Sequence, residues 1–110
     1  MIAASKKGVK VRIITDTDMI HSPGSDIVSL KKAGIPIKSD DKKKRFEGHG
    51  HMHNKFAILD GQTVINGSFN WTRSAVISNS ENVVITKGNS SLSSSFTGEF
   101  ERLWREYKYF

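Results

Sequence analysis

The 110-residue sequence contains no cysteine, only two prolines and no long apolar run. Without cysteine the chain can form no disulfide bond, no thiol nucleophile and no thiolate zinc site, which fits a reducing compartment. No stretch approaches the roughly 20 apolar residues that a membrane-spanning helix requires. The first residues also lack the apolar core of a signal peptide. We therefore expect this chain to be soluble, with no stable membrane insertion of its own.

Acidic residues are also scarce relative to basic ones, since 17 Lys and Arg against 11 Asp and Glu give a net charge of +6. A basic surplus favours polyanionic partners, which include nucleic acids, phosphate esters and anionic lipid surfaces. Charged residues make up 25% of the chain, the ordinary globular share, so wholesale disorder is not expected. The length predicts a single domain over residues 1–110.

The hydrophobic pattern predicts an α/β domain with a mixed β-sheet flanked by helices. Strands are expected at residues 9–15, 35–37 (an edge strand), 55–59, 63–66 and 82–86, and helices at 26–33 (capped by Ser25), 70–77 and 96–107. The Asp60-Gly61 turn joins two of the strands into a hairpin, and residues 39–50 and 89–95 are expected to be exposed loops. The last helix should pack its aromatic face into the core. The first eight residues are typical of a helix end closed by Gly8, so the beginning of the domain is expected to be missing.

The densest group of polar residues surrounds the predicted hairpin. Residues two apart in a strand share a face, so His53 and Lys55 should emerge together at the start of the first strand. Ser68 and Asn70 follow the returning strand, which brings them back to the same end. The imidazole can act as a nucleophile or carry a proton near neutral pH. The ammonium, hydroxyl and amide groups can donate hydrogen bonds to phosphate oxygens, so the cluster suits phosphate chemistry.

The spacing His53-x-Lys55, then Asp60, then Gly67-Ser68-x-Asn70 resembles the HKD signature of the phospholipase D superfamily, H-x-K-x4-D-x6-G-S-x-N, which the chain carries once. The segments at 11–16, 30–35, 52–56, 67–72, 81–83 and 99–104 are similar to the Zucchini/mitochondrial phospholipase D branch. The resemblance implies the phospholipase D/nuclease-like α/β fold. It also implies that this chain is an N-terminally truncated form, without the family's membrane anchor, the first half of its sheet or the zinc-binding insertion of animal members.

A single signature supplies a single imidazole, whereas in-line phosphodiester cleavage needs a nucleophile and an acid on opposite sides of phosphorus. We therefore expect a homodimer with a composite active site on its two-fold axis. The resemblance implies that His53 of one subunit forms a phosphohistidine while His53 of the other protonates the leaving group. Lys55, Ser68 and Asn70 would bind the non-bridging oxygens, with no metal ion or cofactor.

The resemblance also assigns two carboxylates. Glu81 stands where the family carries a downstream glutamate and would orient the imidazole, and Asp60 would have a structural part at the turn.

Trp71 could stack on a base, although packing beneath the site is favoured. His49, His51 and His53 alternate and could bind zinc on paper, but the sequence arranges no carboxylate or thiolate to complete the set, so no metal site is predicted.

A basic run precedes these histidines and consists of Lys42, Lys43, Lys44 and Arg45. It either binds the phosphates of a nucleic-acid backbone or is merely solvated, and His49 and His51 would line the approach to the site.

The resemblance implies an enzyme, a phosphodiesterase, and three functions remain open. The first is a nuclease acting on single-stranded RNA or DNA, which the basic charge favours, and which the resemblance makes an endoribonuclease of the piRNA-producing type. The first alternative is a hydrolase of cardiolipin, an anionic phospholipid, yielding phosphatidic acid; it requires an apolar cleft, and the sequence shows no spare apolar patch near His53. The second alternative is an inactive fragment that binds nucleic acid. The branch further implies a mitochondrial outer membrane location facing the cytosol.

Overall fold

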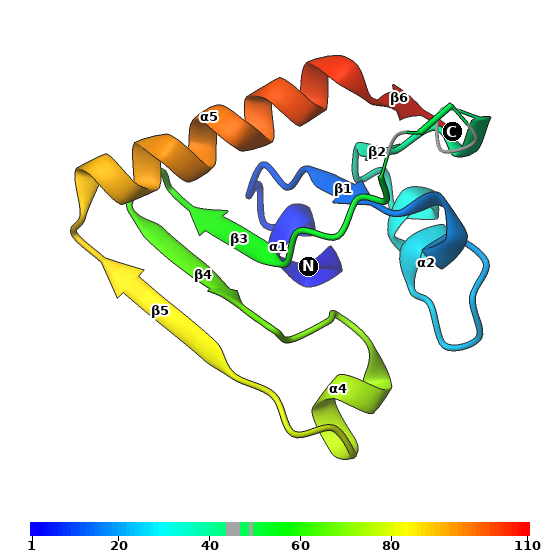
Figure 1. Cartoon of the computed structure of the whole chain (residues 1–110), viewed down its shortest axis with the longest axis horizontal. Coiled ribbons are helices and arrows are strands. Elements are labelled where there is room, and N and C mark those ends of the chain that lie inside the picture. Colours follow the sequence, from blue (N-terminus) through cyan, green and yellow to red (C-terminus); the bar gives the residue numbers. More distant parts are fainter. Residues whose placement is uncertain (44–46, 49) are drawn as a thin grey trace. The chain divides into compact units, whose positions relative to one another are not determined.

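The structure is a computed structural model, shown in Figure 1, and it describes residues 1–43, 47–48 and 50–110. The chain forms two compact units, Met1–His53 with Trp104–Phe110, and Asn54–Leu103. The single domain over 1–110 stays a prediction. Among the described residues no helix is long and apolar enough to cross a membrane.

The first unit contains a small mixed sheet with short helices. Its elements are α1 (Ile2–Lys6), β1 (Ile13–Thr15), the 3-10 helix η1 (Thr17–Met19), α2 (Ile27–Lys32), β2 (Ile37–Ser39) and β6 (Lys108–Tyr109). The strand order is β1-β2-β6, with β1 parallel and β6 antiparallel to β2. The predicted edge position of 35–37 is therefore wrong, because the strand begins after Pro36 and has a neighbour on each side.

The core of the first unit forms where α2 meets β2. Leu30, Ile35 and Ile37 are buried there, against the partly buried Ile2, Val11, Ile13, Ile27 and Phe110. The three-residue spacing of Ile27 and Leu30 places both on one face of α2, as the sequence predicts. The helix begins one residue later than expected, after Asp26, and the Ser25 hydroxyl accepts a hydrogen bond from the Ile27 amide at 3.4 Å.

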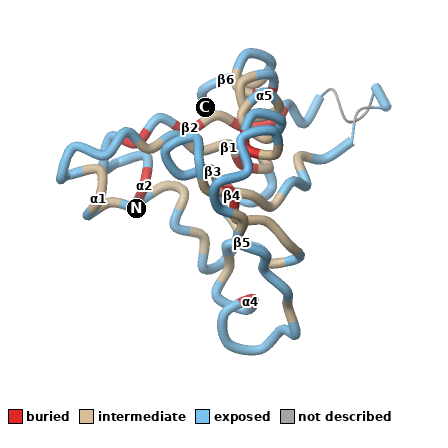
Figure 2. Tube along the Cα trace, turned by 90° about the vertical axis from the view of Figure 1, so that its left-hand side faces the viewer, coloured by how far each residue is buried: buried red, intermediate tan, exposed pale blue. Residues whose placement is uncertain are grey.

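The second unit is built on an antiparallel sheet in the order β3-β4-β5. Its elements are β3 (Phe56–Leu59), β4 (Thr63–Gly67), α4 (Arg73–Ile77), β5 (Val83–Lys87) and the part of α5 (Ser90–Glu106) up to Leu103. The predicted hairpin is confirmed as β3 and β4. Val64, in the central strand, is fully buried, and buried positions are otherwise few in this sheet (Figure 2).

Helix α5 packs on the hairpin through aromatic contact, because the rings of Phe56 and Phe96 meet edge to face with centroids 5.0 Å apart. The expected loop at 89–95 is wrong. The Asn89 side-chain oxygen accepts a hydrogen bond from the Leu92 amide at 3.0 Å and starts the helix at Ser90, one residue after the cap.

The α/β class with a mixed sheet and helices is confirmed, with its strands divided between two sheets. A third correction concerns the expected loop at 39–50. Ser39 belongs to β2 and Asp40 directly follows it, and both are buried. Only the part of this segment after Asp40 is exposed where the structure describes it.

Candidate active site

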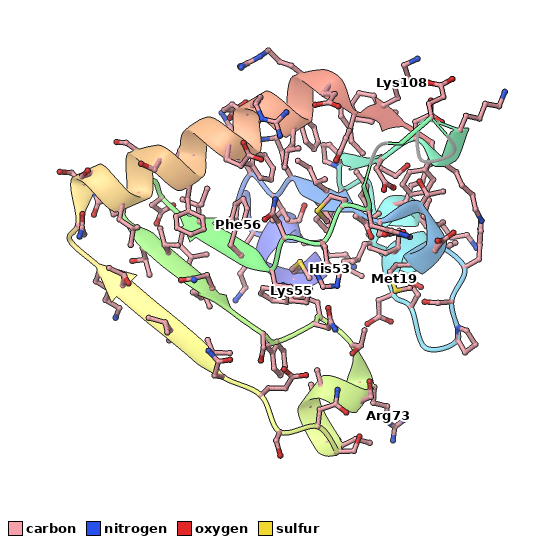
Figure 3. The ribbon with its side chains drawn as sticks, in the orientation of Figure 1. Met19, His53, Lys55, Phe56, Arg73 and Lys108 are labelled. Carbon is pink, nitrogen blue, oxygen red and sulfur yellow. The ribbon has the colours of Figure 1, made fainter. Side chains whose placement is uncertain are left out.

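The β3–β4 hairpin brings the two halves of the sequence signature to one end of the second unit. Lys55 immediately precedes β3, and Gly67 ends β4. The antiparallel register pairs Phe56 with Asn66, so the residues next to this pair, Lys55 and Gly67, lie at the same end. Figure 3 shows Lys55 and Phe56 at the start of β3. The predicted convergence of Lys55 with the Gly67-Ser68 pair therefore follows from the strand register.

Asp60 lies at the opposite end of the same hairpin. It occupies the β3–β4 turn with φ of 52°, in the left-handed region, followed by Gly61 with φ of 65°. Aspartate and glycine tolerate this conformation better than other residues. The structure therefore places Asp60 in the turn and does not bring it together with Lys55 and Ser68.

A close backbone approach explains the glycine of the signature. A Cβ atom built on Gly67 would lie 2.1 Å from the carbonyl oxygen of Asn82, so no other residue fits without movement of the backbone. Because the two backbone segments lie so close, the Ser68 amide donates to the Asn82 carbonyl at 3.1 Å, and the Asn82 amide donates to the Ser68 hydroxyl at 3.0 Å. The pair of bonds fixes the segment before β5 against the end of β4.

This backbone contact delivers Glu81 to Ser68. The Ser68 hydroxyl donates to one carboxylate oxygen of Glu81 at 2.5 Å, and the Asn79 side-chain amide donates to the other at 3.1 Å. The single hydroxyl hydrogen of Ser68 is therefore directed to Glu81 and not to a substrate oxygen. The predicted role of Glu81 in orienting His53 stays a prediction.

The carboxylate of Glu81 is held in its charged form. Its pKa lies below the usual value, mainly because Ser68 donates a hydrogen bond to it and next because Asn79 does. Partial burial raises the pKa and so opposes this shift, while the nearby Lys55 ammonium lowers it by a smaller amount. Hydrogen bonds and a neighbouring positive charge both stabilise a carboxylate. The Lys55 ammonium is thus near enough to Glu81 to favour the charged form of the carboxyl group.

Asn70, the last residue of the signature, and the adjacent Trp71 are open to solvent. Asn70 is exposed, and its amide can donate to a ligand. Trp71 is also exposed, with 61% of its surface accessible, so the expectation that it packs beneath the site is wrong. Thr72 caps α4 through a hydrogen bond from the Ala75 amide, which ends the exposed segment.

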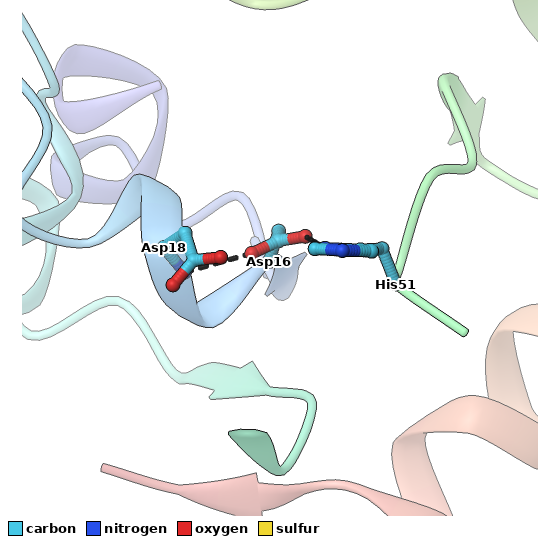
Figure 4. A group of neighbouring side chains, drawn as sticks. All are labelled: Asp16, Asp18 and His51. Atoms are coloured by element: carbon cyan, nitrogen blue, oxygen red, sulfur yellow. Dashed lines mark hydrogen bonds and ion pairs between the residues drawn. The ribbon is translucent and has the colours of Figure 1, made fainter. Parts of the chain in front are cut away.

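In the first unit, two acidic side chains gather beside the histidine-rich segment. The Nδ1 atom of His51 lies 3.0 Å from an oxygen of Asp16, as Figure 4 shows, and Asp16 also accepts the Asp18 amide at 2.7 Å. Lys42 forms an ion pair with Asp18 at 2.8 Å. The expectation that no carboxylate is arranged to complete a metal set is therefore wrong at His51, and the sequence does not reveal it because Asp16 and Asp18 are far from His51 along the chain.

Asp16, Asp18 and His51 are also the one group of the described residues that could offer ligands to a cation, with ligand atoms all within 4.8 Å of one another. Imidazole and carboxylate are ordinary ligands of zinc. Here, however, the side chains of Asp16 and His51 contact each other, and the Asp18 carboxylate is paired with Lys42. The group can hold His51 in place without an ion.

His53 is exposed and is the last residue of the first unit, two residues before Lys55 in the chain. Lys42 and Lys43 lie just beyond β2 and are exposed, as a binding role requires. Lys44, Arg45 and His49, which were also predicted to contact substrate or line its approach, lie outside the described residues. Sequence reasoning missed Asp16 and the buried Asp40, because their partners His51 and Met52 are remote in sequence, and it missed Asn79, which belongs to no motif.

Comparison with known proteins gives consistent matches. A family model described as "Cardiolipin synthase, PLD-like domain" matches residues 1–104. Proteins named mitochondrial cardiolipin hydrolase are similar to the chain. The one from Chlamydomonas reinhardtii is 47% identical over 102 residues, covering 93% of this chain and 43% of the relative. The human one is 42% identical over 102 residues, covering 93% and 38%. The chain therefore spans less than half the length of these curated relatives.

Two solved structures share the fold over nearly the whole chain. A phospholipase D family member, Nuc from Salmonella typhimurium, superposes with a TM-score of 0.82 and 30% identity, covering 99% of this chain and 69% of that one. NucT from Helicobacter pylori gives a TM-score of 0.82 and 25% identity, covering 99% and 70%.

Proposed function

The chain belongs to the phospholipase D superfamily, with the fold that its sequence implies, and from this premise we propose that it is a phosphodiesterase with His53 as nucleophile. The observation that supports this most directly is the arrangement of Lys55, Ser68 and Glu81 at one end of the hairpin. The Lys55 ammonium complements the negative charge on the phosphate oxygens during the reaction.

The chemistry proceeds in two displacements. A ring nitrogen of His53 attacks phosphorus, a P–N bond forms, and the P–O bond to the leaving alcohol breaks. The leaving oxygen takes a proton from a second imidazole, which then removes a proton from the water that hydrolyses the phosphohistidine. Lys55 and the exposed Asn70 donate to the non-bridging oxygens, while Ser68 holds Glu81.

The second imidazole comes from a second copy of the chain in this proposal. One chain carries the signature once, and one His53 cannot stand on both sides of phosphorus. A two-fold homodimer places two copies of His53 about a single axis and completes the site by symmetry.

Cardiolipin is the substrate that we favour. Relatives named cardiolipin hydrolase support it better than they support the endoribonuclease that the basic charge suggests. The second unit also has the apolar surface that the sequence does not reveal: Trp71, Val76 and Ile77, just after the signature, have 61%, 69% and 68% of their surfaces exposed. Exposed apolar groups of this kind suit contact with acyl chains. A mitochondrial location accompanies this choice.

Single-stranded RNA is the second candidate substrate. The net charge of +6 and the exposed Lys42 and Lys43 favour a polyanion longer than a lipid head group. The two candidates share their chemistry at phosphorus and differ in what surrounds it.

Parallel assays distinguish the candidates. The purified protein is incubated with cardiolipin vesicles and with labelled single-stranded RNA, each with and without EDTA. We expect phosphatidic acid from the vesicles, EDTA notwithstanding, and no product with His53→Ala. The control His21→Ala removes an exposed histidine outside the signature and should leave the rate unchanged. Cleavage of RNA alone would favour the second candidate, and RNA binding without any turnover would support an inactive binding fragment.

Subunit mixing tests the composite site. Wild-type and His53→Ala chains are unfolded together, refolded at several ratios and assayed. If each site needs both imidazoles, activity falls as the square of the wild-type fraction. A linear fall, or a light-scattering mass equal to one active chain, contradicts the dimer.

A further inference from the structure

Asp40 is a buried carboxylate whose two oxygens are both occupied by other parts of the first unit. It directly follows β2 and only 6% of its surface is exposed. One oxygen, Oδ1, accepts the Thr17 amide at 2.7 Å and lies 2.8 Å from the Thr17 hydroxyl. The other, Oδ2, accepts the Met52 amide at 3.1 Å. The carboxylate therefore joins the segment after β1 to the residue that precedes His53.

The backbone around Asp40 strengthens this junction. The Asp40 amide donates to the Thr15 carbonyl at 3.4 Å, and the Thr17 hydroxyl also contacts the Asp40 carbonyl. A buried carboxylate is costly unless hydrogen bonds compensate it. Bonds from backbone amides to a charged acceptor are among the stronger hydrogen bonds of proteins. Three segments remote in sequence thus depend on one side chain.

We propose that Asp40 is a positioning residue for His53, acting through the Met52 amide. The inference rests on the proposed role of His53 as nucleophile. The bond from the Met52 amide to Asp40 fixes the main chain one residue before His53. Because a misplacement of about 1 Å can cost roughly 100-fold in rate, such a restraint matters for in-line attack.

An Asp40→Asn variant removes this restraint with almost no change in shape. A carboxylate can accept on both oxygens, whereas an amide accepts on one and donates from the other. In either orientation, the side-chain NH2 group of the asparagine therefore faces a backbone N–H group, that of Thr17 or that of Met52, and one of the two hydrogen bonds is lost. The Thr17 side has a backbone amide and a hydroxyl to satisfy, so we expect the oxygen to stay there and the Met52 bond to break.

Asp41→Asn provides the matched control. It removes the same charge from the neighbouring position, but Asp41 is exposed and accepts only a local bond from the Lys43 amide at 2.9 Å among the described contacts. A second variant, Met52→Pro, removes the donor instead of the acceptor and leaves both Asp40 bonds to Thr17 in place. It keeps the inference testable if Asp40→Asn does not fold.

The experiment measures kcat and KM on a small chromogenic phosphodiester, together with hydrogen exchange at the Met52 amide and the NMR signals of the His53 ring. With Asp40→Asn and Met52→Pro we expect kcat to fall roughly 100-fold while KM changes little. We expect Asp40→Asn to abolish protection of the Met52 amide, and both variants to shift or broaden the His53 signals. Asp41→Asn should match the wild type throughout.

A wild-type kcat in either folded variant overturns the inference, as does a wild-type His53 spectrum when the Met52 bond is lost. A fall in kcat that merely follows the unfolded fraction also contradicts it. If the wild type has no phosphodiesterase activity, the proposed function fails, while the His53 spectra still decide whether Asp40 positions that ring.

Discussion

Replacement of Gly67 by alanine should be the most damaging single-methyl change in the second unit. The added Cβ would lie 2.1 Å from the Asn82 carbonyl oxygen, whereas ordinary contact begins near 3.4 Å, so the two segments must separate by about 1.3 Å. Bonds of 3.0 and 3.1 Å between Ser68 and Asn82 cannot survive that movement.

The expected loss of stability combines the two lost hydrogen bonds with the cost of overpacking. Each hydrogen bond contributes about 0.5–1.5 kcal/mol, and overpacking costs about 1–3 kcal/mol, so we expect Gly67→Ala to lower the free energy of unfolding by roughly 2–6 kcal/mol. With a urea dependence of about 1–3 kcal/mol per molar for small proteins, the midpoint should fall by roughly 1 M or more. Glu81 would also leave Ser68, so activity should fall in the fraction that stays folded.

The control is the same substitution at Gly98. This residue lies inside α5, and a Cβ built there meets nothing within 4 Å. Alanine at an unhindered helical position should raise stability by about 0.5–1 kcal/mol. Urea unfolding followed by circular dichroism checks both variants. Equal midpoints for Gly67→Ala and the wild type would refute the close approach.

Three further predictions concern the site and the core. Ser68→Ala removes the main cause of the lowered pKa of Glu81, so a carboxyl-carbon NMR titration should show that this pKa moves upward. A carboxyl group whose pKa is lowered by folding stabilises the fold above its usual pKa, and this stability is lost as the pH falls through the lowered pKa. The variant should therefore lose less stability than the wild type as the pH falls through that range. Leu103→Ala, at a buried position, should cost about 2–5 kcal/mol in urea unfolding, whereas Val76→Ala, at an exposed one, should stay within about 0.5 kcal/mol. The activity of His51→Ala, like that of the wild type, should be the same with and without EDTA. A wild-type rate that requires added zinc would contradict a metal-free reaction.

The parts of the fold that the sequence predicts well are those determined by local pattern. The β3–β4 hairpin follows from apolar strands around the Asp60-Gly61 turn, and its register alone places Lys55 beside the end of β4. The loop expected at 89–95 failed because serine is only a modest helix former, while the Asn89 cap that starts the helix is a single side chain in a polar run.

The parts that the sequence could not predict depend on contacts between remote residues. The Ser68–Glu81 bond requires the pairing of β4 with β5 and the close approach at Gly67. Asp40 reads as one of several charges before a basic run, and its burial becomes visible only with its partners, which lie 23 and 12 positions away.

The hydrogen bond between Asp40 and Met52 should also make the position of His53 insensitive to the length of the segment between these two residues. It closes the segment that carries the basic run, with its ends 12 positions apart, against the sheet of the first unit. Doubling the length of a closed loop raises its closure free energy by only about 0.6 kcal/mol. Insertions and deletions between these two anchors should therefore be tolerated without displacing His53. We expect changes in the length and charge of this segment to leave the position of the histidine unaltered.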